Sequence, residues 1–199
     1  ACSSAVQGSY ADSKWHNFTA VRNSSTSIVL YVDGVQVGQD TALAAGPLDT
    51  SATLYVGVDS NGSSNYWYGH VGQIFIYNYA NDLDQIKANY MSPQVAVQQG
   101  ASPKSFTSDG LVGYWDMDDP GINDQDETVT DSSGNNKPLT LMGDNAKGNN
   151  GTGMDCNVAG KFGTGCDLDG EDDFLVYADT WNLLNGATAF TQWCQDTKL

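Results

Sequence analysis

The segment Trp15–Gly38, WHNFTAVRNSSTSIVLYVDGVQVG, decides the fold of this chain. Residues 15–22 alternate bulky apolar side chains with small or polar ones, and residues 28–32 are β-branched or aromatic. Alternation with a period of two indicates strands that bury one face. Asp33 and Gly34 supply the positive φ angles that a two-residue hairpin needs. The segment therefore predicts three consecutive antiparallel strands joined by tight turns.

The rest of the first 91 residues continues the all-β pattern and closes with a helix. Runs of β-branched and aromatic residues predict further strands over 52–58 and 66–78. Residues 82–90 combine a capping-box spacing with an apolar stripe, which predicts a short helix. Residues 92–109 are rich in Pro, Gln, Gly and Ser and predict a linker.

The composition limits the classes of partner. The 199 residues include 8 basic and 24 acidic side chains, which gives a formal charge of −16. Such a surface repels phosphate backbones and anionic lipid, so we expect no nucleic-acid binding. No apolar run is long enough to span a bilayer, so we expect no membrane insertion.

Four cysteines accompany many Asn, Ser and Thr residues, which predicts disulfides in an oxidising, extracellular compartment. A zinc site is disfavoured because no C-x₂-C pair or histidine cluster is present. Cys156 and Cys166 are expected to pair, because the glycine-rich loop between them can close without strain. Asn-x-Ser/Thr sequons that offer glycosylation sites begin at Asn17, Asn23, Asn61 and Asn150.

Several motifs resemble the laminin-G-like, concanavalin A-like jelly rolls of extracellular proteins. W-H-x-F-x-A-V-R and L-Y-V-D-G within 15–38 resemble two of the family's later strands, and residues 55–78 resemble its last strands. GLVGYWDMD at 110–118 resembles the family's first strand, and GKFGTGCDLDGEDDFLV at 160–176 resembles a subsequent strand and turn. Residues 1–91 thus resemble the second half of such a domain and residues 110–199 the first half.

The resemblance implies an all-β antiparallel sandwich, a jelly roll, with its halves in reversed order and one short helix near 82–90. Three arrangements remain open. The chain is a permuted monomer, a pair of half-domains that copies of the chain complete head to tail into a filament, or a window from a tandem array. The resemblance also implies that Cys2 and Cys194 pair, because their segments would be neighbours in the sandwich.

The resemblance further implies a Ca²⁺ ion at the sandwich rim, since many jelly rolls of this superfamily hold one. The candidate ligands are Asp116, Asp118 and Asp131, because calcium prefers several carboxylate and carbonyl oxygens. The alternative is that these residues only form turns. For Asp131 in particular, the Asp-Ser-Ser-Gly sequence predicts a turn.

Glycosidases of the superfamily carry three alternating carboxylates on one strand. Asp169, Glu171 and Asp173 have this spacing, but Gly170 interrupts the run and a turn there would splay the carboxylates. We therefore expect no catalysis.

The predicted function is a non-enzymatic extracellular module for adhesion, glycan binding or surface assembly, and the alternative is a glycoside hydrolase-like enzyme. The expected partners are copies of the chain or a surface glycan. Tyr66, Trp67 and Tyr68 are candidate sugar-stacking residues, although alternation should bury part of this run.

Overall fold

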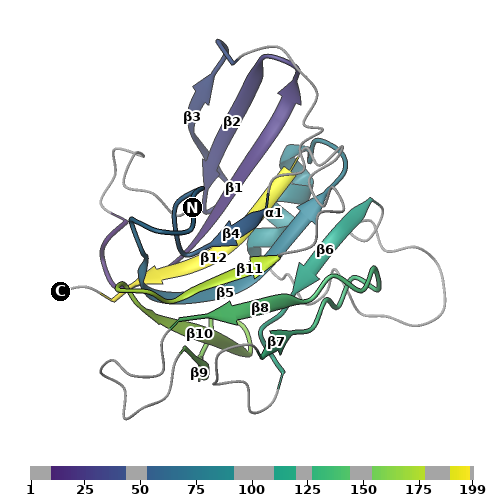
Figure 1. Ribbon diagram of the computed structural model, residues 1–199. Coiled ribbons are helices and arrows are strands. Elements are labelled where there is room, and N and C mark those ends of the chain that lie inside the picture. The colour runs from purple at the N-terminus through teal and green to yellow at the C-terminus, as the bar shows by residue number, and fades with distance from the viewer. Residues whose placement is uncertain are drawn as a thin grey trace.

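The computed structural model describes residues 10–43, 53–91, 110–119, 127–143, 154–177 and 189–197. These residues form two antiparallel sheets that face each other, with one helix (Figure 1). The predicted all-β sandwich with a short helix is therefore confirmed. The predicted linker, 92–109, lies outside the described residues.

The large sheet has eight strands in the order β3-β2-β1-β12-β5-β10-β9, with β6 also paired to β5. Its strands are β1 (Trp15–Ser24), β2 (Ser27–Val32), β3 (Val35–Asp40), β5 (Tyr68–Tyr77), β6 (Leu111–Trp115), β9 (Asp155–Ala159), β10 (Thr164–Asp169) and β12 (Ala189–Asp196). The small sheet has four strands in the order β4-β11-β8-β7. They are β4 (Leu54–Val56), β7 (Thr128–Val129), β8 (Leu139–Met142) and β11 (Phe174–Tyr177).

The predicted meander is present as β1, β2 and β3. Asp33 and Gly34 take φ angles of 50° and 77°, as the hairpin turn requires. The Asp33 carboxylate accepts a hydrogen bond from the backbone N–H of Asn17 at 2.9 Å, and its other oxygen lies 2.7 Å from Nδ1 of His16. These contacts fasten the hairpin turn to β1.

The two segments that resemble half-domains share both sheets within this one chain. β5 comes from the first segment, yet its partners β12, β10 and β6 all come from the second. In the small sheet, β4 of the first segment pairs with β11 of the second. Ile74 therefore lies opposite Trp115 of the same chain.

Apolar side chains fill the space between the sheets, including Ile74, Trp115, Leu141, Leu168 and Leu175. A second cluster lies on the other face of the large sheet, beneath α1 (Leu83–Met91), and its largest members are Phe75, Tyr77, Ile86 and Tyr114. Figure 1 shows α1 against one end of the large sheet, on the side away from the small sheet.

Helix α1 begins where the sequence predicted. The Asp82 side chain accepts a hydrogen bond from the backbone N–H of Gln85 at 2.9 Å, which caps the helix. Tyr90 stacks on Trp193 of β12 with ring centroids 5.6 Å apart. The helix therefore covers one part of the outer face of the large sheet, by which we mean the face turned away from the small sheet.

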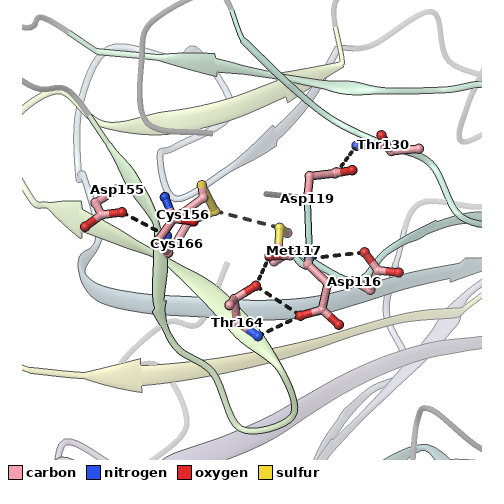
Figure 2. Close-up of a disulfide and its surroundings, with 10 residues drawn as sticks. Asp116, Met117, Asp119, Thr130, Asp155, Cys156, Thr164 and Cys166 are labelled. Carbon is pink, nitrogen blue, oxygen red and sulfur yellow. Dashed lines mark hydrogen bonds between the residues drawn. A yellow bond between two sulfur atoms is a disulfide. The ribbon is translucent and has the colours of Figure 1, made fainter. Parts of the chain in front are cut away.

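The predicted Cys156–Cys166 disulfide is confirmed, and it joins β9 to β10 (Figure 2). The Cys166 sulfur lies 3.8 Å from the Met117 sulfur, inside the core between the sheets. Cys194 is also disulfide-bonded. Its predicted partner, Cys2, lies outside the described residues.

Candidate functional site

Five side chains form a continuous row across five neighbouring strands of the large sheet. The strand register places Trp15 opposite Gln195, Gln195 opposite His70, His70 opposite Asp167, and Asp167 opposite Asp155. Residues directly opposite one another in adjacent strands point to the same face of a sheet. The five side chains therefore lie side by side, and we call them the outer row.

The outer row lies on the outer face of the large sheet. Cys166 and Leu168 flank Asp167 in β10, and both are buried between the sheets. Because successive side chains of a strand point to opposite faces, Asp167 points away from that core. Figure 2 likewise shows Asp155 and Cys156 on opposite sides of β9. All members of the outer row are partly exposed.

Trp15 reaches across the sheet at a place where two glycines make room for it. A Cβ on Gly72 would lie 3.2 Å from the indole, and one on Gly165 would lie 3.4 Å from it. The indole therefore lies close to the backbone of β5 and β10. Its side chain remains partly exposed. The outer row thus begins with an indole that the sheet itself supports.

His70 occupies the middle of the outer row and faces an oxygen atom on each side. Its Nδ1 lies 3.2 Å from Oε1 of Gln195, and its Nε2 lies 3.4 Å from a carboxylate oxygen of Asp167. The Gln195 amide also donates to the backbone carbonyl of Ser13 at 2.6 Å, which fixes its orientation. The polar half of the outer row is therefore held in a defined arrangement.

Asp167 is a perturbed carboxyl of the outer row. Partial burial raises its pKa, and the negative charges of Asp155 and Asp169 raise it further. The nearby His70 offsets part of that effect. The arrangement therefore concentrates negative charge around Asp167 with incomplete compensation.

The structure separates the three predicted sugar-stacking residues. Tyr68 is 45% exposed, lies opposite Asp169 and shares the outer face with His70. Trp67 instead packs against the core between the sheets, and Tyr66 lies beside Phe174. As alternation predicted, only part of this run faces solvent, and Tyr68 is the member that adjoins the outer row.

Asp131, one of the predicted metal ligands, has a structural role in its turn. Its carboxylate accepts three backbone hydrogen bonds, from Tyr114 at 3.1 Å, Ser133 at 2.9 Å and Lys137 at 3.0 Å. It is 7% exposed. The predicted turn is present, and calcium binding by this residue stays a prediction.

The other two predicted metal ligands lie nearby and also fasten loops. Asp116 accepts hydrogen bonds from the Ser132 hydroxyl at 2.9 Å and from the backbone N–H of Asp118 at 3.2 Å. Asp118 accepts one from the backbone N–H of Thr164 at 2.7 Å. Asp118 is exposed and Asp116 is partly exposed, so both keep carboxylate surface toward solvent.

Comparison with known proteins finds a family match for the first part of the chain. Residues 3–87 match a family model, Laminin_G_3, described as the Concanavalin A-like lectin/glucanases superfamily. This segment belongs to the concanavalin A-like lectin/glucanase superfamily. It includes β1 to β5 and the start of α1, and so contributes Trp15, His70 and Tyr68 to the outer face. No curated protein and no solved structure matches the chain.

The superfamily's name includes glucanases, which use carboxylates, and an acidic turn follows β10. Carboxylate oxygens of Asp169, Asp172 and Asp173 lie within 4.8 Å of one another. The turn carries Glu171 out to solvent, as predicted, but it brings Asp169 and Asp173 together, so the expected splaying of these two is wrong. The cause is a reversal at Gly170, whose φ is 75°.

Asp173 is the buried member of this acidic turn. Burial raises its pKa to about 7, and Asp169, Asp172 and Asp167 add to the effect, while a hydrogen bond from the backbone N–H of Asp169 opposes it. That bond is 3.0 Å long. Asp169 in turn accepts backbone hydrogen bonds from Glu171 and Asp172. These carboxylates therefore shape the turn.

The predicted glycosylation sites differ in accessibility. Asn17 is 1% exposed within β1, and its side-chain oxygen accepts a hydrogen bond from Thr19, so a glycan there would have to displace packed neighbours. Asn23 and Asn61 are exposed. Asn150 lies outside the described residues. In the part of the chain that the structure describes, no helix has the length and hydropathy to cross a membrane.

Proposed function

We propose that this chain is a non-enzymatic extracellular module that binds a surface glycan through the outer row and Tyr68. The single observation that carries the proposal is the continuity of the outer row over five strands. With strands spaced about 4.8 Å apart, it extends about 19 Å. That length suits an oligosaccharide chain better than one sugar.

The chemistry of the outer row suits sugar rings. A sugar presents an apolar ring face together with hydroxyl groups that donate and accept hydrogen bonds. Trp15 and Tyr68 offer partly exposed aromatic faces, while His70, Gln195 and Asp167 offer donors and acceptors between them. The superfamily of residues 3–87 includes lectins by name, which supports the same reading.

The alternative, a glycoside hydrolase-like enzyme, is less well supported. Such enzymes need two carboxyl groups that flank the scissile bond, one as acid and one as base or nucleophile. Asp167 and Asp169 are two residues apart on the outer face of β10. However, one oxygen of Asp169 accepts backbone hydrogen bonds from Glu171 at 2.7 Å and from Asp172 at 3.2 Å. That carboxylate is committed to its turn, so a second free carboxyl group is lacking in this pair.

A second candidate function is assembly, in which copies of the chain exchange half-domains and form a filament. It is favoured by the position of β5, whose partners β12, β10 and β6 belong to the other segment. Either segment alone would leave the β5 face and its edges uncovered, and such surfaces seek complementary strands. Light scattering over a range of concentrations tests this, since a monomer that never grows in mass would exclude it.

The glycan proposal is tested by glycan-array binding with matched variants. Tyr68→Ala removes a side chain that is 45% exposed beside the outer row, and we expect array binding to weaken. Leu83→Ala is the control, because it removes a side chain that is 46% exposed on α1 and should leave binding unchanged. Polysaccharide turnover by the wild-type chain would instead support the enzyme, and a blank array would contradict the proposal.

A further inference from the structure

We propose that the glycan bound by the outer row carries protonated amino groups, so that its class is a cationic amino-sugar oligomer. This rests on the proposed glycan binding and adds the charge of the ligand. The observation behind it is that Asp155 and Asp167 lie directly opposite one another at one end of a mixed aromatic and polar row. The other end of that row is the indole of Trp15.

Negative charges repel one another within this part of the sheet. Like charges directly opposite one another in neighbouring strands destabilise a sheet. Asp167 has such a neighbour in Asp155 and a second one in Asp169, two residues further along β10. Both neighbours raise the pKa of Asp167, on top of the effect of its partial burial. A bound ammonium group would relieve this repulsion, whereas a neutral hydroxyl would not.

The chain's own basic side chains do little to neutralise the negative charge of Asp155 and Asp167. Lys14 precedes Trp15, but its ammonium group binds Asp12 at 2.7 Å. Lys161 lies over the Trp193 ring, 5.4 Å from its centroid. Within the outer row the one basic side chain beside Asp167 is that of His70, at 3.4 Å, and the Asp167 side chain remains 37% exposed. Among the described residues, no lysine or arginine forms an ion pair with Asp155 or Asp167, so a cationic ligand would supply the missing counter-charge.

Aromatic rings near the carboxylates would also attract an ammonium group. An ammonium group within about 6 Å of an aromatic ring is attracted by that ring's face. Trp15 lies in the same row as the carboxylates, and Tyr68 lies opposite Asp169 at the neighbouring position of β10. An amino-sugar chain laid along the outer row would therefore meet the Trp15 indole at one end and the two carboxylates at the other, with Tyr68 beside the row. An acidic glycan would instead be repelled.

A single divalent cation fits the outer row less well than a chain of ammonium groups. Among the described residues, the carboxylates that converge closely enough for a metal ion are those of Asp169, Asp172 and Asp173. Asp155 and Asp167 do not belong to that group. The outer row is extended, so it suits a ligand whose positive charges are also spread along a line.

The test compares three probes by calorimetry on the full chain: a glucosamine hexamer, an N-acetylglucosamine hexamer and a uronic-acid oligomer of similar length. We expect the glucosamine hexamer to bind about tenfold more tightly than the acetylated one, as expected for charge-assisted hydrogen bonds. This preference should shrink as salt rises, because the carboxylates are partly exposed. The uronic-acid oligomer should bind weakest.

Asp167→Asn and Asp155→Asn keep the shape and remove one charge each, and we expect each to reduce the preference several-fold. Asp40→Asn is the matched control, since Asp40 ends β3 at the far edge of the same sheet. Its side chain accepts a hydrogen bond from Ala42 at 2.8 Å, which Asn preserves. Melting temperatures of all three variants exclude misfolding as the cause of any change.

The outcomes separate this inference from the proposed function. Equal binding of the acetylated and free-amine hexamers, or a preference that Asp167→Asn leaves intact, overturns the inference while glycan binding stands. Tighter binding of the uronic-acid oligomer does the same. If no oligosaccharide binds here or on the array, the proposed function and the inference fail together.

Discussion

Replacing Asp131 by alanine is expected to be among the most damaging single changes to this fold. The Asp131 carboxylate accepts backbone hydrogen bonds from Tyr114, Ser133 and Lys137, at 3.1, 2.9 and 3.0 Å. Two of these close its own turn, and the third ties that turn to β6. Because Asp131 is 7% exposed, water cannot easily replace the lost acceptor.

The magnitude follows from the number of donors left without a partner. A buried donor that loses its acceptor costs about 1–3 kcal/mol. The three donors share one carboxylate, so their losses are not fully additive, and we expect a loss of about 3–5 kcal/mol for Asp131→Ala. Asp131→Asn keeps an oxygen for two of the donors, both served by Oδ1, but presents an amide to the N–H of Lys137. We expect it to cost about 1–3 kcal/mol.

The measurement is urea unfolding of the wild type and of each variant, followed by tryptophan fluorescence. Asp59→Ala is the matched control, because Asp59 also accepts backbone hydrogen bonds within a turn, from Asn61 at 3.3 Å and Ser63 at 3.4 Å, but near solvent. Its loss should cost less than about 1 kcal/mol. A loss below about 1 kcal/mol for Asp131→Ala in the presence of chelator would refute the reasoning. A loss found only with calcium present would assign the carboxylate to a metal instead.

Three further predictions concern pH, metal and redox state. The pKa of His16 is raised: burial alone would lower it, but hydrogen bonds with Asp33 and Asp12 outweigh that effect. A raised pKa stabilises the fold fully below the unfolded value of 6.5, and this stabilisation is lost as pH rises through the folded value. His16→Gln should therefore destabilise the chain more at pH 5 than at pH 9 in thermal melts, and a pH-independent loss would contradict this. We propose that calcium binds near Asp118, so millimolar calcium should raise the melting temperature relative to chelator, and Asp118→Asn should abolish the shift. Identical melting temperatures would remove that proposal. The Cys156–Cys166 bridge closes a loop with a sequence separation of 10, so Cys156→Ser should lower the free energy of unfolding by about 3 kcal/mol in denaturant titrations. An unchanged midpoint would show that the bridge contributes little.

The elements that could be predicted from the sequence are those whose signals are local. Asp33-Gly34 defines a hairpin turn, and the Asp82 cap defines where α1 begins, because each depends on neighbours in the chain. The disulfide between Cys156 and Cys166 was predictable for the same reason, since its loop is short and rich in glycine.

The outer row could not be predicted, because it exists only once the strand order is known. Trp15 and Asp167 belong to segments that resemble opposite halves of a domain, and nothing local to either residue indicates the other. The available signal was alternation within β10, which places Asp167 and Asp169 on one face. The acidic spacing in the sequence instead singles out Asp169, Glu171 and Asp173, whose arrangement depends on the turn at Gly170.

The position of β5 has a consequence for how the chain is made. Tyr77 pairs with Ala189 and Phe75 with Thr191, so β5 leaves the ribosome long before its partner β12 exists. At 5–20 residues per second, the wait between Tyr77 and Ala189 is roughly 6–20 seconds. During that time one edge of the apolar run Ile74-Phe75-Ile76 lacks its native partner β12, although β6 can pair with the other edge once Trp115 has been made, and contacts between residues so distant in sequence form slowly. Productive folding therefore depends on keeping the β12-facing edge of this apolar strand shielded until β12 has been synthesised.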